Sequence, residues 1–207
     1  MKIDFAAARP EAADVLAFIV TKSSFETFEF PLENAQMVRD TGKLARFKGE
    51  AGQSFLLIAE EGGKLVRIVL LGVAEGDAGD YQKAGGEIVA KVQTSGAQHI
   101  AIHGGNLSAK AAAEVAYGAT LRNWRMDKYR TKLAETSKPT VEGLTVVSAP
   151  AEAADLWASY AAIADGVALT KELVTEPANI IYPESFVERC QHLKELGVEI
   201  TVLDDKQ

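Results

Sequence analysis

Residues 172–186 read ELVTEPANIIYPESF, and two prolines divide this stretch. From Ala153 to Val174, apolar side chains recur at helical spacing, namely Leu156, Tyr160, Ile163, Val167 and Val174. Pro177 ends this helix, because the residue before a proline is displaced from the helical region. Pro183 suits the first turn of a second helix, where its missing N–H costs no hydrogen bond. The stretch therefore predicts two helices joined by a short junction.

The second helix is expected over residues 183–197, with an apolar stripe and a stop at Gly197. Residues 198–203, VEITVL, then alternate as a strand does. A lone strand has no ladder partner and cannot bury its apolar face. We therefore expect the chain to enter a second α/β domain whose remainder lies beyond Gln207. The expected domains are the N-terminal domain at 1–150, the linker helix at 151–175 and the start of the second domain at 176–207.

Short apolar runs bounded by turn residues predict the strands of the first domain. They lie at residues 3–5, 15–20, 54–60, 64–73, 99–105 and 143–149. The third and fourth runs flank Glu61-Gly62-Gly63, which predicts an antiparallel hairpin. Helical patterns alternate with the other runs. The sequence therefore predicts an α/β fold, with a mixed sheet and helices on both of its faces.

Two helices are expected in the second half of this domain, over residues 80–96 and 108–129. Asp80 and Ser108 are the expected N-caps, and Gly96 is the expected stop. The pair Gly85-Gly86 would cost roughly 1 kcal/mol per residue relative to alanine, so we expect close packing there. The other helix has a flat stripe of small residues that suits packing on a sheet, made of Ala112, Val115, Ala116 and Ala119. Residues 136–143 are expected to form a loop.

The composition is that of an ordinary globular protein, since 47% of the 207 residues are hydrophobic and 25% are charged. No apolar run approaches the roughly 18 residues of a membrane span, so no membrane partner is expected. Acidic residues within the first 15 positions argue against a signal peptide, and the single cysteine, Cys190, fits a reducing compartment. We therefore expect a cytoplasmic protein.

The net charge of −7 makes nucleic acid a poor partner, because an acidic surface repels phosphates. One stretch runs against this average: residues 122–132 carry five cations around Trp124 and Tyr129. They fit a solvated helix end whose cations oppose the helix dipole. A nucleic-acid contact is the alternative, and both interpretations stay open at this point.

Isolated residues offer no clear chemistry. His99 and His103 lie four positions apart on one face of an expected strand, but no third metal ligand is evident. Cys190 has no basic partner to activate it, and His192 is expected on an exposed surface. Asp40-Thr41-Gly42 carries the aspartic protease triplet without its apolar flanks, which predicts a turn.

A glycine-rich stretch, GVAEGDAGD at 72–80, leads from a strand into a helix, which is a place that suits anions. It lacks the P-loop and dinucleotide-binding patterns, and its acids repel phosphate, so we expect a crossover turn. Composition, periodicity and spacing thus assign no active site.

Residues 168–190, ALTKELVTEPANIIYPESFVERC, resemble the start of the catalytic domain in the leucyl aminopeptidase (cytosol aminopeptidase) family. That family carries an Asn/Thr-Glu-Pro-Ala-Asn segment followed by a helix that begins with proline, and residues 175–179 match it. Upstream, EVAYGATLRNWRMDKYRTK (114–132) resembles the family's small-residue segment with its aromatic and basic ending. The resemblance spans most of the chain, and the junction is its most specific part.

The resemblance implies an enzyme that removes N-terminal residues, typically leucine, from peptides. Two divalent metal ions, Mn or Zn, would polarise the scissile carbonyl and activate a bridging water. It further implies a macro-domain-like N-terminal domain and a homohexamer. The family's ligands lie in motifs such as Gly-Lys-Gly-x-x-Phe-Asp-Ser-Gly-Gly and Asn-Thr-Asp-Ala-Glu-Gly-Arg, and this sequence contains neither.

No catalytic, cofactor-binding or metal-binding residue is therefore assigned in this chain. By itself it is expected to be inactive and to serve the architecture of the hexamer. The alternative is a stand-alone module of the macro type. Such a module would bind a nucleotide-like ligand at 72–77 or 103–106, or contact nucleic acid through residues 122–132.

Overall fold

The computed structural model describes residues 1–75, 78–204 and 206, with the side chains of 78 and 79 left aside. The chain divides into two compact units, Met1–Asp165 and Gly166–Gln207. The strands are β1 (Lys2–Ala6), β2 (Val15–Thr21), β3 (Ser54–Glu61), β4 (Lys64–Val73), β5 (His99–His103) and β6 (Gly143–Val147). The α-helices are α1 (Ala35–Leu44), α2 (Ala78–Val92), α3 (Ala109–Asn123), α4 (Glu152–Thr175) and α5 (Pro183–Cys190). Two 3₁₀ helices cover Glu135–Ser137 and Gln191–Leu196.

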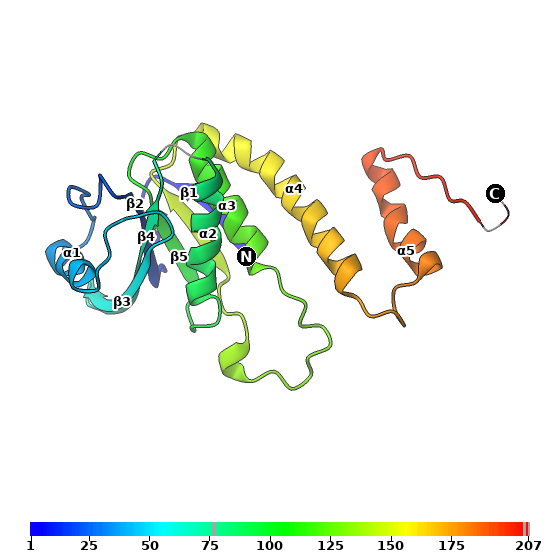
Figure 1. Ribbon diagram of the computed structural model, residues 1–207, viewed down its shortest axis with the longest axis horizontal. Coiled ribbons are helices and arrows are strands. Elements are labelled where there is room, and N and C mark those ends of the chain that lie inside the picture. Colours follow the sequence, from blue (N-terminus) through cyan, green and yellow to red (C-terminus); the bar gives the residue numbers. More distant parts are fainter. Residues whose placement is uncertain (76–77, 205, 207) are drawn as a thin grey trace. The chain divides into compact units, whose positions relative to one another are not determined.

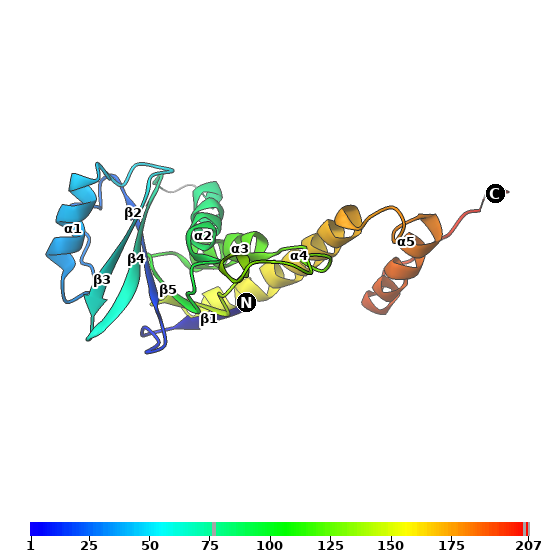
Figure 2. The same ribbon diagram turned by 90° about the horizontal axis from the view of Figure 1, so that it is seen from below.

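The first unit is built on a six-stranded sheet with the order β1-β6-β5-β2-β4-β3 (Figure 1). Every neighbouring pair is parallel except β3 and β4, which form the expected antiparallel hairpin. Helix α1 covers one face, and α2 and α3 cover the other (Figure 2). The predicted fold class, a mixed sheet with helices on both faces, is confirmed. All six predicted strands of this unit are present.

Each face of the sheet has its own hydrophobic core. Odd-numbered residues of β2 and β4, such as Val15 and Val69, and even-numbered residues of β5, such as Ile100, pack with α2 and α3. Even-numbered residues of β2 and β4, such as Phe18 and Leu70, pack with α1 and a phenylalanine-rich loop. The central strand β2 is buried along almost its whole length, which explains why its sequence is a continuous apolar run.

Helices α2 and α3 approach each other closely at glycines. A Cβ atom on Gly85 would lie 1.9 Å from the carbonyl oxygen of Val115, and one on Gly118 would lie 1.8 Å from that of Gln82. A Cβ atom on Gly86 would have 3.5 Å to its nearest neighbour. The expected close packing is therefore confirmed, and Gly85 rather than Gly86 requires it.

The ends of these two helices differ from the prediction. Helix α2 already begins at Ala78, so Asp80 lies in its first turn and accepts a hydrogen bond from the Ala74 N–H at 2.8 Å. The helix ends at Val92 instead of Gly96, because the Ser95 hydroxyl and N–H both bond the Val92 carbonyl. Gly96 still supplies the left-handed turn that follows, with φ of 85°.

Helix α3 begins as predicted, with the Ser108 side chain accepting from the Ala111 N–H at 3.1 Å. It ends at Asn123, six residues earlier than expected, where Trp124 becomes extended. The Gln93 side chain donates to the Asn123 carbonyl at 2.9 Å and satisfies one of the helix's last acceptors. The Asp40-Thr41-Gly42 triplet lies inside α1 and not in a turn. Its Gly42 packs against Phe25 and Leu70, which explains why a glycine suits that helix face.

The second unit contains the end of α4, helix α5, a 3₁₀ helix and an extended tail. Pro183 occupies the first turn of α5 as predicted, and Gly197 ends the following 3₁₀ helix in a left-handed conformation. The predicted strand at 198–203 is wrong, because those residues pair with no strand in the described chain. An alternating sequence does not form a ladder without a partner.

The predicted helix at 153–174 is confirmed as α4, but several of its apolar residues are exposed. Leu156, Ile163 and Val174 all face solvent to a large extent, whereas Ala153 and Ala164 are buried. The fully buried side chains of α4 are therefore small alanines, while much of its larger apolar stripe is exposed. None of the helices in the described part of the chain combines the length and the apolar character needed to cross a membrane.

Candidate functional site

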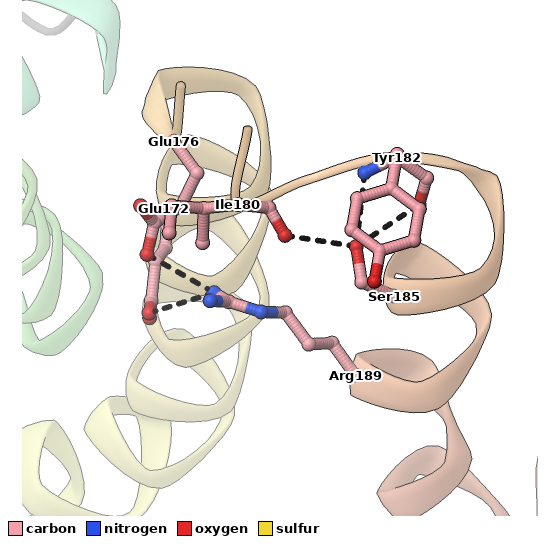
Figure 3. A network of polar contacts seen from close by, with 6 residues as sticks. All are labelled: Glu172, Glu176, Ile180, Tyr182, Ser185 and Arg189. Carbon is pink, nitrogen blue, oxygen red and sulfur yellow. Dashed lines mark hydrogen bonds and ion pairs between the residues drawn. The ribbon is translucent and has the colours of Figure 1, made fainter. Parts of the chain in front are cut away.

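The junction between α4 and α5 contains a compact network of polar contacts, shown in Figure 3. The Arg189 guanidinium, on α5, lies 3.2 Å from the Glu176 carboxylate and 3.4 Å from that of Glu172. The Glu176 side chain is fully buried, while Glu172 is about half exposed. Burial of a carboxylate is unfavourable unless it is paired, so the Arg189 cation is what makes this position tolerable.

The two prolines shape the backbone around this network. The Pro177 carbonyl accepts hydrogen bonds from the N–H groups of Ile180 and Ile181, at 2.8 and 3.0 Å, which forms a tight turn after α4. The Ser185 hydroxyl then bonds the Ile180 carbonyl at 2.9 Å and accepts from the Tyr182 N–H at 2.9 Å (Figure 3). The Ser185 hydroxyl thus connects the turn to the start of α5 through two hydrogen bonds.

The polar groups of this junction stabilise the fold and do not form a catalytic arrangement. The Arg189 guanidinium offers hydrogen-bond donors and no acceptor, and both carboxylates are engaged with it, so the pair acts as a structural contact. Ser185 is engaged with backbone groups on both sides, and in the described part of the chain its hydrogen bonds go to backbone atoms and not to a basic side chain that could activate it. The network therefore fixes the path of the chain where α4 gives way to α5.

The cleft expected for a macro-type ligand lies at the carboxyl ends of the parallel strands. A cavity of 300 Å³ opens there, lined among others by Thr21, Tyr81 and the loop 104–107. Ligands of open α/β sheets commonly bind at this edge. Part of the other expected contact, at 72–77, lies outside the described residues, because 76 and 77 are not described. The crossover expected over 72–80 does connect β4 to α2.

The two histidines of β5 have different environments. His99 Nε2 lies 2.8 Å from the Thr145 hydroxyl, an ordinary structural hydrogen bond. His103 stacks on Phe18, with ring centroids 5.2 Å apart. Burial, and secondly the nearby Arg9 cation, lower the pKa of His103 to about 4. His103 is therefore neutral at pH 7, and its Nε2 is buried without a hydrogen-bond partner among the described residues.

Metal-binding groups do not gather in the part of the chain that the structure describes: no cluster of three or more His, Cys, Asp or Glu side chains is found there. His192 is exposed, as expected, and its Nδ1 lies 2.7 Å from the Arg189 carbonyl. Cys190 is a partly buried free thiol. The residues described here therefore do not fit a two-metal centre.

The basic stretch at 122–132 begins in the last turn of α3 and continues beyond it, and an acidic residue within the stretch partly neutralises its charge. Arg125 forms a 2.6 Å ion pair with Asp127, and Arg130 approaches the same carboxylate at 3.6 Å. The hydrogen bond from Arg125 holds the pKa of Asp127 below its usual value. Only Arg122 lies in the last turn of α3, so the helix-end interpretation applies to that residue alone.

Sequence reasoning missed Arg189 and Ser185, which complete the junction network. Their signal was present in the spacing: a serine two positions after a helix-starting proline is placed to bond the preceding turn. It also missed Glu114, a buried carboxylate of α3 that accepts a hydrogen bond from Tyr160 on α4 at 3.2 Å. A lone Glu within a small-residue stripe was the available signal.

Comparison with known proteins places these features in a family. The model for the N-terminal domain of the cytosol aminopeptidase family matches residues 37–133. The chain is 37% identical over 209 residues to a probable cytosol aminopeptidase of Gluconobacter oxydans, covering 98% of this chain and 42% of that protein. It is 35% identical over 166 residues to one of Caulobacter vibrioides, covering 78% of this chain and 34% of that protein.

Solved structures with the same fold include a mutant of tomato leucine aminopeptidase, with a TM-score of 0.75 and 24% identity over 94% of this chain and 42% of that one. The bottromycin maturation enzyme BotP, in complex with Mn, has a TM-score of 0.63 and 21% identity over 89% of this chain and 36% of that one. The chain thus spans less than half the length of these relatives. It belongs to the cytosol aminopeptidase (leucyl aminopeptidase) family, of which it carries the N-terminal region.

Proposed function

We propose that this chain is the N-terminal portion of a cytoplasmic, two-metal aminopeptidase that removes N-terminal residues, typically leucine, from peptides. The observation that carries this proposal is the alignment of 98% of the chain with 42% of a probable cytosol aminopeptidase. The junction adds to it, because the Glu176 segment that resembles the family's catalytic-domain entry is held in one conformation by Arg189 and Ser185.

In this proposal the chain contributes architecture and the remainder of the protein contributes chemistry. Residues 1–150 form the N-terminal domain, 151–175 the linker helix and 176–207 the entry to the catalytic domain. The domains assemble as a hexamer that limits access to the active sites. The same considerations favour this role over a stand-alone nucleotide-binding or nucleic-acid-binding module, because such a module does not account for the relatives.

Metal ions, Mn or Zn, would supply the activated water and polarise the peptide carbonyl. The BotP structure was solved with Mn, which supports metal dependence in a protein of this fold. The residues described here gather no ligand set, so we assign no metal and no reaction step to them. The ligands would come from the part of the relatives that this chain does not align with.

Hydrolysis of leucine-p-nitroanilide by the purified 207-residue chain tests this assignment. With Mn or Zn added, we expect no turnover above the buffer and metal blank. An aminopeptidase of known activity in the same buffer serves as the positive control. Turnover that rises with the concentration of the chain and disappears with EDTA would refute the purely architectural role.

A further inference from the structure

Strand β3 is a long and unprotected edge of the sheet. It pairs with β4 in one continuous antiparallel register, from Ser54 opposite Leu71 to Glu61 opposite Lys64, and no strand of the described chain lies on its outer side. Proteins usually protect such edges with proline, lysine, a bulge within the strand or a very short strand. The eight residues SFLLIAEE contain no proline or lysine, and their register has no bulge. Their two charged residues, Glu60 and Glu61, lie together at the C-terminal end and leave residues 54–59 without a charge.

Hydrogen-bonding groups of alternate residues on β3 point away from the sheet. The Gly72 N–H donates to the Gln53 carbonyl at 2.9 Å, which makes this a hydrogen-bonded pair. Antiparallel ladders alternate, so the backbone groups of residues 54, 56, 58 and 60 face outward. The Asn34 side chain agrees with this alternation, because it reaches the outward Glu60 carbonyl at 3.4 Å. No partner is found among the described residues for the outward groups of Leu56 and Ile58.

An apolar patch lies directly beside this open edge. Leu56 and Ile58 are 38% and 64% exposed on one face of the hairpin. Leu65, which is 75% exposed, shares that face because it pairs with Glu60. The opposite face of β3 is packed on the core through Ala59. An exposed apolar face that continues into an unpaired strand edge is typical of an association surface.

We propose that β3 pairs antiparallel with β3 of a second copy of this chain, with Leu56 opposite Ile58 of the second copy. Only the outward-facing residues can form hydrogen-bonded pairs, so the register must place even-numbered residues opposite one another. In the proposed register the twofold axis passes through Leu57 and all four outward residues lie opposite a partner. Pairing at Glu60 exchanges the 3.4 Å contact of its carbonyl with the Asn34 side chain for the backbone of the second copy. Such an interface is isologous, as in most homodimers.

The side chains make this register self-complementary. Leu56 meets Ile58 on the exposed face, and Ser54 meets Glu60, so no two carboxylates oppose each other. A shift by two residues in one direction would place Glu60 opposite Leu56, and in the other direction would place Ser54 opposite Ile58. The first shift leaves Ser54 without a strand partner, and the second leaves Glu60, whose carbonyl would keep its contact with the Asn34 side chain. A second copy is therefore the occupant that fits this edge.

Sedimentation equilibrium of the 207-residue chain tests the proposal. We expect a monomer–dimer equilibrium that strengthens with added NaCl, because two chains of net charge −7 repel each other. Ile58→Lys should raise the dissociation constant about tenfold or more, since it places two cations in the apolar seam. The matched control is Leu44→Lys, an exposed residue at the end of α1, which should leave the constant unchanged. Circular dichroism checks that each variant is folded.

The register is tested by disulfide formation in a Cys190→Ser background. Mixing Leu56→Cys with Ile58→Cys should give a disulfide-linked heterodimer, whereas either variant alone should link much more slowly. Amide exchange on the unmodified chain should slow at Leu56 and Ile58 as its concentration rises. A chain that stays monomeric, a dimer that Ile58→Lys leaves unchanged, or equally fast linking of the single variants would each overturn the proposal.

Discussion

The guanidinium of Arg189 lies 3.2 Å from the buried carboxylate of Glu176, thirteen positions earlier in the chain (Figure 3). The contact closes a loop that contains both prolines of the junction. Because the Glu176 side chain has no exposed surface, its charge depends on partners within the protein. The junction is therefore an ordered element and not a flexible linker.

Replacement of Arg189 by methionine should loosen the junction. The change keeps most of the side-chain volume but removes the cation beside Glu176, at a cost of roughly 1 to 3 kcal/mol. We expect amide exchange at Ile180 and Ile181, whose N–H groups bond the Pro177 carbonyl, to speed up by about tenfold or more. Glu172→Gln is the control and should have a much smaller effect, since that carboxylate is half exposed. Equal exchange in all three proteins would contradict the role given to Arg189.

Alanine at Gly85 should destabilise the first unit strongly. The added methyl group would lie 1.9 Å from the Val115 carbonyl oxygen, so α2 and α3 would have to separate. Overpacking of this kind costs roughly 1 to 3 kcal/mol, measured as a lower urea midpoint. Gly86→Ala is the matched neighbour. It meets nothing closer than 3.5 Å and should stabilise the helix by up to about 1 kcal/mol. Similar effects of the two substitutions would show that the helices are not in close contact there.

Stability should fall with acid partly because of His103. Burial lowers the pKa of His103 from 6.5 to about 4, so the folded protein holds this ring neutral while the unfolded chain protonates it. The contribution is therefore complete above pH 6.5, declines as the pH falls from 6.5 to 4, and is lost below that. It amounts to roughly 2 to 3 kcal/mol.

The His103→Phe variant isolates this contribution, because phenylalanine can keep the stacking contact with Phe18 without taking up a proton. We expect the free energy of unfolding of the variant to increase relative to that of the original protein as the pH is lowered from 7 to 4, because only the original protein loses stability through His103. Urea denaturation at several pH values measures the difference. A difference that does not vary with pH would mean that His103 titrates normally.

The contact between Tyr160 and Glu114 should contribute to the docking of α4 within the first unit. Glu114 is buried, and its second oxygen has no hydrogen-bond partner in the described chain. Burial and the Glu114 charge raise the pKa of Tyr160. Tyr160→Phe should lower stability by about 1 to 2 kcal/mol, because it leaves Glu114 less satisfied. Glu114→Gln removes the charge that helps to raise the pKa of Tyr160, so this pKa should fall. A spectrophotometric titration of the tyrosines should therefore show one tyrosine that ionises at lower pH than in the original protein. Thermal unfolding unaffected by Tyr160→Phe would show that the hydrogen bond contributes little.

Local patterns predicted the six strands, because burial on a sheet leaves a continuous or alternating apolar run, and they predicted the helices α2 to α5. Helix α1 was not predicted, and part of it was expected to be a turn. The β3–β4 hairpin follows directly from its two glycines. Helix ends were less predictable, since they depend on distant groups such as Gln93, which bonds the last carbonyl of α3. Residues 198–203 have the pattern of a strand but lack the partner that a strand needs. The exposed stripe of α4 likewise shows that helical spacing of apolar residues indicates a face, not its burial.

The junction motif itself was recognisable from sequence, but its physical basis was not. Glu176 and Arg189 are far apart along the chain, and the turn made by Pro177 is what brings them together. The spacing of charges alone would not distinguish this pair from any exposed pair on two helices. What distinguishes the Glu176–Arg189 pair from an exposed pair is the burial of Glu176, which is visible only in the folded chain.

A chimera tests the central claim most directly. In it, this chain replaces the aligned region of the Gluconobacter oxydans relative, which is 42% of that protein. Provided that the unaltered relative hydrolyses leucine-p-nitroanilide, we predict that the chimera does so too. Its activity should be lost with EDTA and restored by Mn or Zn, while the isolated chain stays inactive. A folded chimera without activity, beside an active relative, would contradict the account that this chain is the N-terminal portion of such an aminopeptidase.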